Sequence, residues 1–314
     1  MRIARIELEG SPVTAVVEGD AVRPLPGVEI LELLTAEPAE RDRRAANGGP
    51  PRPLSDVRLL SPVEPASVRD FSVFEQHGEG ASMAVAGPDA KVQDAWYERP
   101  AFYFSNPHAT TGPGDAIEPP AGSTGLDFEL ELAAVIGRRA RNVSVEEAEA
   151  CIAGYTIFND WSERSFSLLE ARLPFGFHKA KDFANTFGPW IVTPDELEPY
   201  QQGDRLNLRM TAYVNGAEIG SDVLASMAWS FPELVHFSAR GAWIAPGDVI
   251  ASGTCGGGCL FELWGRNQAQ APPPLKPGDE VRLEVEGIGA LTNTVGDFQP
   301  ELPALPPARS RARA

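Results

Sequence analysis

Two glutamates, Glu129 and Glu131, stand two residues apart in the apolar run 127–137, DFELELAAVIG. We expect a strand at Phe128–Gly137, and side chains two positions apart on a strand point to the same face of a sheet. The apolar residues around the pair indicate a strand that is buried on both faces. Two buried carboxylates repel each other and need a cation between them, and their oxygens suit Mg²⁺ or Ca²⁺. The alternative is a half-exposed strand whose acidic side faces water.

Two further carboxylates and a histidine have positions that suit a reactive site. Asp160 follows a predicted strand at Tyr155–Asn159. A third metal ligand would come from there, although an aspartate at the end of a strand commonly caps a turn. Asp70 precedes an aromatic-rich stretch, and His77 lies seven residues later. This histidine is either a general base or an ordinary surface or core residue.

A glycine-rich segment follows at 247–265, GDVIASGTCGGGCLFELWG. Glycines allow the backbone to approach a ligand closely and leave N–H groups free to bind it. Glu262 lies between Phe261 and Leu263, so we expect burial to tune this carboxylate as an acid or base partner. The alternative is a glycine hairpin with a surface glutamate.

The elements that must position these residues are mostly short strands, with no strand–helix alternation and no internal repeat. Glycine (30 residues) and proline (29) are frequent, which favours a β-rich fold with many turns. The other predicted strands are Arg2–Glu9, Val13–Val17, Val57–Val63, Val249–Ser252 and Val281–Glu286. We also expect helices at Asn142–Ala153 and Pro232–Arg240, a hairpin at Leu206–Ile219 and a loop at Glu37–Pro53. The first helix carries Ser144 and Glu147 at the spacing of a capping box.

The chain length of 314 residues favours two domains or one large one. We place a boundary near residue 65, which gives a small N-terminal β domain (1–65) and a large second domain (66–300). The tail at 301–314 combines Pro, Arg and Ala without a period, so we expect it to be flexible.

Composition excludes several classes of function. The formal net charge is −17, which disfavours nucleic acid and anionic membrane surfaces as partners. No apolar run reaches the roughly 20 residues of a membrane span, and the N-terminus does not resemble a signal peptide. We therefore expect a cytoplasmic protein. Cys255 and Cys259 are four residues apart with no second Cys or His pair beside them in the sequence, which favours buried thiols over a zinc site.

Six ordered motifs between about Asp70 and Val295 resemble the fumarylacetoacetate hydrolase superfamily. They are Asp70 with His77, Glu129 with Glu131, 159–164 (NDWSER), Lys181 with 188–193 (GPWIVT), 247–254 (GDVIASGT), and 275–279 (LKPGD) with 286–289 (EGIG). The presence of Glu262 favours the fumarylacetoacetase-like branch. The resemblance implies a mixed β-rich α+β fold, in which a β-sandwich roll forms the C-terminal domain beside a small N-terminal β domain. It also implies a homodimer.

The resemblance further implies a set of site residues. The metal ion, Mg²⁺ or Ca²⁺ with Mn²⁺ as a further candidate, would be held by four carboxylates: Asp70, Glu129, Glu131 and Asp160. The catalytic residues would be His77 and Glu262, which orient and polarise a water molecule, with Lys181 and Arg164, which bind and polarise the substrate. The substrate would also contact Tyr103, Ser167 and Thr254. Ser167 stands where fumarylacetoacetase has a glutamine, so the identity of the substrate is open.

The implied reaction is hydrolysis of a carbon–carbon bond in a diketo acid of the fumarylacetoacetate or acylpyruvate type. A divalent ion would polarise the carbonyls and stabilise an enolate, while His77 and Glu262 activate water. The alternative is a decarboxylase, isomerase or hydratase that acts on a 2-oxo acid at the same metal–enolate site. A family member without catalytic activity is a third reading. In each reading the partner is a small-molecule diketo or 2-oxo acid.

Overall fold

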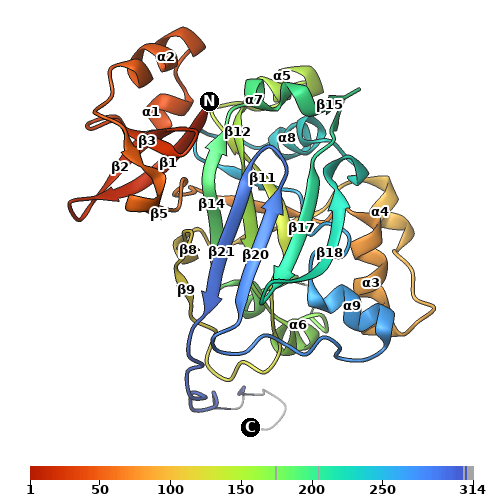
Figure 1. Ribbon diagram of the computed structural model, residues 1–314. Helices are drawn as coiled ribbons and strands as arrows, with labels where there is room; N and C mark the ends of the chain where they lie inside the picture. The colour runs from red at the N-terminus through yellow and green to blue at the C-terminus, as the bar shows by residue number, and fades with distance from the viewer. Residues whose placement is uncertain (174, 204, 307, 310–314) are drawn as a thin grey trace.

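The computed structural model describes residues 1–173, 175–203, 205–306 and 308–309. Its strands form two main sheets that lie face to face, with helices around them (Figure 1). The large sheet has the strand order β4 (Arg52–Pro53), β3 (Ala21–Pro24), β2 (Ser11–Glu18), β1 (Arg2–Leu8), β14 (Asn185–Val192), β12 (Ile152–Asp160), β11 (Leu130–Ile136), β19 (Val249–Ala251), β6 (Val68–Phe71) and β7 (Phe102–Ser105). Two short strands extend it, since β5 (Arg58–Leu60) pairs with β1 and β8 (Thr110–Thr111) pairs with β14.

The second sheet has five strands in the order β18 (Ala217–Val223), β17 (Arg209–Val214), β20 (Glu280–Val285), β21 (Gly289–Val295) and β9 (Ala116–Ile117). Two small pairs complete the strands: β10 (Leu126–Asp127) with β13 (Ser162–Glu163), and β15 (Gln201–Gln202) with β16 (Arg205–Leu206). The helices are α1 (Ile30–Leu34), α2 (Pro38–Ala46), α3 (Glu75–Ala86), α4 (Asp94–Glu98), α5 (Val145–Glu149), α6 (Arg164–Glu170), α7 (Pro194–Leu197), α8 (Phe231–Ala239) and α9 (Leu260–Asn267). Short 3₁₀ turns lie at Leu54–Asp56, Pro107–Ala109, Lys179–Lys181, Glu198–Tyr200 and Leu224–Ser226.

Strand β11 lies at the centre of the molecule and is buried on both faces, as the sequence predicts. Leu130 and Leu132 pack into the core between the two sheets, together with side chains of β17 and β20. Ala133 and Val135 pack into a second core on the opposite face, with side chains of α1, β14 and β19. Glu131 shares the face of these two residues because strand side chains alternate. The mixed β-rich α+β sandwich expected from the sequence is confirmed.

The predicted loop at Glu37–Pro53 is wrong, because the structure has helix α2 there. Pro38 occupies the first turn, where its missing N–H costs no hydrogen bond. Glu40 accepts hydrogen bonds from Arg43 at 2.7 Å and from Arg44 at 2.8 Å. Pairs three and four residues apart support an isolated helix. Apart from Pro38, the glycines and prolines that indicate a loop lie beyond the C-terminal end of α2.

Other predicted elements are present with shifted ends. The capping box of Ser144 and Glu147 is confirmed, but helix α5 ends at Glu149 and the chain enters β12 at Ile152. The alternative interpretation of a glycine hairpin with a surface glutamate is wrong, because Glu262 is buried and lies on helix α9.

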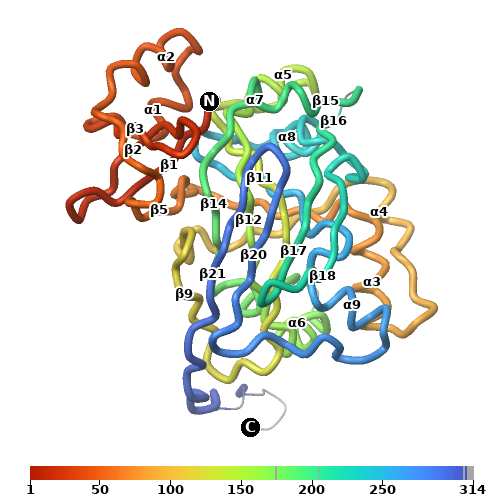
Figure 2. Tube along the Cα trace, viewed as in Figure 1, coloured from red at the N-terminus to blue at the C-terminus, as the bar shows by residue number. Residues whose placement is uncertain are grey.

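The N-terminal strands belong to the same sheet as the rest of the chain. β1 pairs with β2 on one side and with β14 on the other, so hydrogen bonds cross from the first 65 residues to the remainder (Figure 2). The boundary near residue 65 stays a prediction. In the tail, residues 301–306 and 308–309 are exposed and form no helix or strand, and its flexibility stays a prediction. Within the part of the chain that the structure describes, no helix is long and apolar enough to cross a membrane.

Candidate active site

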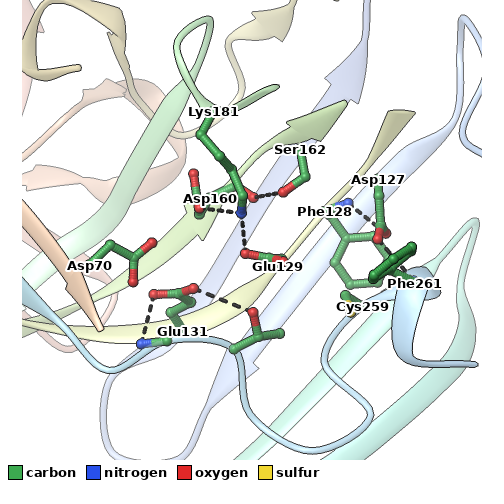
Figure 3. A network of polar contacts seen from close by, with 12 residues as sticks. Asp70, Asp127, Phe128, Glu129, Glu131, Asp160, Ser162, Lys181, Cys259 and Phe261 are labelled. Carbon is green, nitrogen blue, oxygen red and sulfur yellow. Dashed lines mark hydrogen bonds and ion pairs between the residues drawn. The ribbon is translucent and has the colours of Figure 1, made fainter. Parts of the chain in front are cut away.

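Three carboxylates converge at one end of the large sheet. The register pairs Ala251 with Asp70 across β19 and β6, and Glu131 with Phe158 across β11 and β12. These pairings bring Asp70, Glu131 and Asp160 together from three strands (Figure 3). One oxygen of each lies within 4.8 Å of the other two. We call these three residues the carboxylate cluster.

The carboxylate cluster fits a hard divalent cation. All three side chains are almost fully buried. Burial raises the pKa of Asp70 and of Glu131 well above the usual range, and the charges of neighbouring carboxylates raise both further. Asp70 Oδ1 and Asp160 Oδ1 are buried and have no hydrogen-bond partner among the described residues. A divalent ion bound by these oxygens would remove both the repulsion and the missing contacts.

The turn after β19 holds Glu131 in place. The N–H of Gly253 donates to Glu131 Oε2 at 3.1 Å, and the Thr254 hydroxyl lies 3.5 Å from Oε1. Gly253 has a φ of +79°, and a Cβ there would collide with the carbonyl oxygen of Phe71. Only glycine suits this position. The Gly-Thr pair therefore orients a carboxylate of the cluster.

Glu129 lies beside the carboxylate cluster and is paired with two cations. Its Oε1 accepts from Arg164 Nη2 at 2.7 Å, and its Oε2 accepts from Lys181 Nζ, which also donates to Asp160. Burial acts to raise the pKa of Glu129, but the charges of Lys181 and Arg164 outweigh it and hold the pKa below its usual value. Burial acts to lower the pKa of Lys181, but Asp160 and Glu129 raise it, so this amine stays protonated. The two cations are thus engaged with internal carboxylates.

Tyr103 reaches the carboxylate cluster from the neighbouring strand. It lies opposite Asp70 across β6 and β7, and its hydroxyl bonds Asp70 Oδ2 at 2.5 Å and also Asp160 Oδ2. Burial and the surrounding carboxylates raise the pKa of Tyr103 well above its usual value. The phenol therefore remains a hydrogen-bond donor at the edge of the cluster.

His77 and Glu262 meet where helix α3 crosses helix α9. His77 Nδ1 lies 3.7 Å from Glu262 Oε2. Glu262 is held by the Gly257 N–H at 2.7 Å and by Arg266 Nε at 2.9 Å. Burial acts to raise the pKa of Glu262, but these contacts and His77 outweigh it and lower the pKa. A carboxylate that stays ionised can orient the imidazole ring and stabilise its protonated form.

Two glycines allow these helices to approach. A Cβ on Gly80 would collide with Glu262 Cγ, and a Cβ on Gly265 would collide with the carbonyl oxygen of Gly80. The backbones of α3 and α9 are therefore in direct contact at this crossing. The distance between His77 and Glu262 depends on both glycines.

A cavity of about 520 Å³ opens over these groups. Its walls include all but three of the eleven predicted site residues, namely Asp70, His77, Tyr103, Glu129, Glu131, Arg164, Lys181 and Thr254. Asp160 and Glu262 lie directly behind the wall: Asp160 accepts a hydrogen bond from Lys181, and Glu262 lies 3.7 Å from His77. Ser167 does not line the cavity. Its hydroxyl donates to the carbonyl oxygen of Arg164 at 3.0 Å, which turns it away from a ligand there.

Eight predicted site residues therefore line the cavity, and three (Asp160, Glu262 and Ser167) do not.

Asp127 is a buried residue of the site that the sequence reasoning missed. Its carboxylate accepts from the N–H groups of Leu260 at 2.9 Å and Phe261 at 3.0 Å, which begin helix α9. It also accepts from Arg164 Nε at 2.9 Å. Asp127 thus links helix α9, which carries Glu262, to Arg164, which binds Glu129. Its place two residues before Glu129 was the available signal, but its partners lie far along the chain.

Arg99 is a second residue that the sequence reasoning missed. It lines the cavity and is exposed, and it forms no ion pair among the described residues. The aromatic side chains of Trp96 and Phe177 lie in the same wall, and Phe177 packs edge-on against Tyr103. The cavity therefore combines an acidic floor, formed by Asp70, Glu129 and Glu131, with an apolar wall and the cation Arg99, which has no ion-pair partner in the part of the chain that the structure describes.

Comparison with known proteins agrees with this arrangement. The family model described as fumarylacetoacetate (FAA) hydrolase C-terminal matches residues 68–296, and the model described as Rv2993c-like, N-terminal matches residues 1–62. The chain is 28% identical to fumarylacetoacetase of Oryza sativa subsp. japonica, over 88% of this chain and 77% of the relative. It is 30% identical to oxaloacetate tautomerase FAHD2A, mitochondrial, of Bos taurus, over 85% of this chain and 79% of the relative.

A solved structure of maleylpyruvate hydrolase from Sphingobium sp. SYK-6, in complex with manganese(II) ion and pyruvate, has the same fold. Its TM-score is 0.71 at 23% identity, over 95% of this chain and all of that one. The relatives thus include hydrolases and tautomerases. The match over residues 68–296 and the 30% identical relative establish that the chain belongs to the fumarylacetoacetate hydrolase family.

Proposed function

We propose that this protein is a divalent-metal-dependent hydrolase that cleaves a carbon–carbon bond in a diketo acid. The observation that carries the proposal is the position of His77, which lines the cavity beside the acidic floor and has Glu262 behind it at 3.7 Å. A base with an orienting carboxylate is the arrangement that water activation requires.

The metal ion would be held by Asp70, Glu131 and Asp160, with Glu129 as a fourth ligand. Mg²⁺ and Ca²⁺ suit this all-oxygen donor set, and Mn²⁺ is compatible with it. When bound, such an ion polarises a carbonyl group of the substrate. The unpartnered oxygens of Asp70 and Asp160 support this assignment.

The chain's own residues then supply the proton transfers. His77 accepts a proton from water, and Glu262 stabilises the resulting imidazolium. The hydroxide oxygen bonds to the substrate carbonyl carbon, and the π electron pair of the carbonyl bond moves to the carbonyl oxygen. When that pair returns, the adjacent carbon–carbon bond breaks, and the departing carbon receives the proton from His77. The products are a carboxylic acid and a shorter keto acid.

Cations in the cavity offset the negative charge of substrate and intermediates. Lys181 is protonated and lines the cavity, so it can donate to a developing oxyanion. Arg164 and Lys181 already contact internal carboxylates, whereas Arg99 has no such partner among the described residues. We assign to Arg99 the contact with a distal carboxylate of the substrate.

A tautomerase is the second candidate, because the relative with 30% identity is an oxaloacetate tautomerase. Tautomerisation needs only the removal and return of a proton, which His77 can perform without hydroxide attack. The two reactions use the same cavity and differ in whether a water molecule enters the product.

A panel assay tests the proposal. Purified protein is mixed with acylpyruvates and with diketo acids that carry a distal carboxylate, and the ultraviolet absorbance of the diketone is followed with Mg²⁺ or with chelator. We expect absorbance loss that requires the metal, and an Arg99→Ala variant with a KM raised about tenfold for the diacids only. Turnover of oxaloacetate tautomers alone would favour the second candidate.

A further inference from the structure

Four arginines gather on two loops at the end of β11 that lies opposite the carboxylate cluster. The loops are residues 137–142, GRRARN, which follow β11, and residues 240–247, RGAWIAPG, which follow α8. They contain four arginines and no carboxylate, in a chain whose formal net charge is −17. We call the following five exposed side chains the arginine patch: Arg138, Arg139, Arg141, Arg240 and Trp243.

Hydrogen bonds hold the two loops together. The N–H of Ala140 donates to the carbonyl oxygen of Ile244, and the N–H of Ile244 donates to the carbonyl oxygen of Ala140, each at 3.0 Å. The N–H of Gly241 donates to Asn142 Oδ1 at 2.7 Å. Ala140 and Ile244 are buried, whereas the arginines beside them are exposed. The arginine patch therefore has one fixed base.

Trp243 orients two of the guanidinium groups. Arg139 Cζ lies 3.6 Å from the centre of the Trp243 ring, and Arg141 Cζ lies 5.9 Å from it. Arg141 also donates one N–H to the carbonyl oxygen of Gly241 at 3.1 Å. Stacking on an aromatic ring uses the face of the guanidinium plane and leaves the N–H donors at its edge free. Arg139 and Arg141 therefore present oriented donors to solvent.

The charge of the arginine patch is not balanced within the described part of the chain. None of its four arginines forms an ion pair there. The nearest carboxylates along the chain are Asp248, which pairs with Arg69, and the exposed Glu146, Glu147 and Glu149 around α5. An arginine keeps its charge at any physiological pH. An anionic partner would therefore reduce the repulsion between these side chains.

We propose that the arginine patch is a docking site for an acidic segment of another protein. Guanidinium groups bind carboxylates through paired N–H donors, and Arg and Trp are enriched among the residues that contribute most to protein interfaces. A short acidic segment contacts the arginines alone. A membrane or a nucleic acid duplex extends beyond the patch and meets the glutamates of α5 and the acidic remainder of the surface. The patch does not line the active-site cavity, so a docked segment leaves that cavity open.

The binding test uses the whole protein without substrate, so its result does not depend on the proposed reaction. The probe is a fluorescein-labelled deca-glutamate peptide, and its fluorescence anisotropy is followed as protein is added. We expect saturable binding at low ionic strength that weakens as sodium chloride is added, because salt screens exposed charges. The double variant Arg138→Glu with Arg139→Glu should raise Kd at least about tenfold, since like charges then face the peptide.

A second double variant, Arg52→Glu with Arg209→Glu, is the matched control. Both of these arginines are exposed and lie outside the arginine patch, and their replacement changes the net charge by the same amount. The control should change Kd by less than about twofold, because distant exposed charges are screened. Circular dichroism checks that both double variants are folded.

Three results would overturn the proposal. The first is the absence of saturable binding to the wild type at low ionic strength. The second is a loss of affinity that is equal in the two double variants, or absent from both. The third comes from competition with phosphatidylserine vesicles or with a DNA duplex. If either displaces the probe at a lower concentration of negative charge than unlabelled deca-glutamate does, the patch binds that class of ligand and not an acidic protein segment.

Discussion

The two halves of the candidate active site are built in different ways. The carboxylate cluster stands on strands β6, β11 and β12 of one sheet, where the hydrogen-bond register through β19 fixes Asp70 and Glu131. The pair of His77 and Glu262 stands on two helices that touch at Gly80 and Gly265. The carboxylate cluster, which we call the strand half, depends on backbone pairing within the core. The pair of His77 and Glu262, which we call the helix half, depends on the packing of α3 against α9.

This difference separates two tasks that the site must perform. A sheet register is shared by many residues, so it can hold like charges close together despite their repulsion. A helix crossing depends on a few contacts, and a small shift there changes the distance between base and carboxylate. Metal binding should therefore be lost only by changes on the strands, whereas turnover should be lost by changes on either half.

The largest effect is expected from Glu131→Gln, which breaks the strand half. The variant removes one charge from the carboxylate cluster, so we expect it to abolish metal binding and, with it, activity. Metal content after dialysis and elemental analysis measures this directly. Glu118→Gln, a change at an exposed glutamate, is the matched control and should retain wild-type metal content. Equal metal content in wild type and Glu131→Gln would remove Glu131 from the ligand set.

His77→Ala should break the helix half alone. The loss of a general base lowers turnover by about 10²- to 10⁴-fold, and metal content should stay unchanged because the carboxylate cluster is intact. Calorimetric titration with Mn²⁺ and steady-state kinetics test the two statements on the same preparation. A variant that loses metal together with turnover would contradict the separation of the two halves.

Gly80→Ala should show the same separation with a smaller effect. The added methyl group pushes α3 away from Glu262, so we expect kcat to fall by about 10- to 100-fold while metal affinity is retained. Val85→Ala on the same helix is the control, since Val85 is 59% exposed. Unchanged kcat in Gly80→Ala would mean that the helix crossing does not set the reactive geometry.

The smallest effect concerns the acid stability of the helix half. Glu262 has a lowered pKa, so its ionised form stabilises the fold at neutral pH, and this contribution is lost as the pH falls below about 4. We expect Glu262→Gln to be less stable by about 1–3 kcal/mol at pH 7, with a difference that shrinks toward pH 3. Urea unfolding of both proteins with chelator measures it. A difference that stays constant with pH would contradict the lowered pKa.

The strand half was largely predictable from the sequence, because period-two alternation is a local pattern. Glu131 lies on strand β11 and Glu129 directly precedes it, and Asp160 stands at a strand end that local β-propensity marks. The structure nevertheless separates the two glutamates. Glu131 joins the carboxylate cluster, whereas Glu129 pairs with Lys181 and Arg164.

The helix half was less predictable, since its geometry depends on contacts far apart in the chain. Neither Gly80 nor Gly265 shows from its own neighbours that the two will touch. Asp127 was overlooked because the N–H groups it binds lie at the start of α9, 133 and 134 residues later. Helix α2 was missed for a local reason, since flanking glycines and prolines obscured its Glu–Arg pairs.

Isotope labelling of the products tests the central claim most directly. The protein is incubated with Mg²⁺ and a diketo acid in water enriched in heavy oxygen, and the products are examined by mass spectrometry. We expect two fragments, with one heavy oxygen atom in the carboxylate of the released acid, and no fragments from His77→Ala. An intact, rearranged substrate without heavy oxygen in a new carboxylate would contradict carbon–carbon hydrolysis and assign the site to proton transfer.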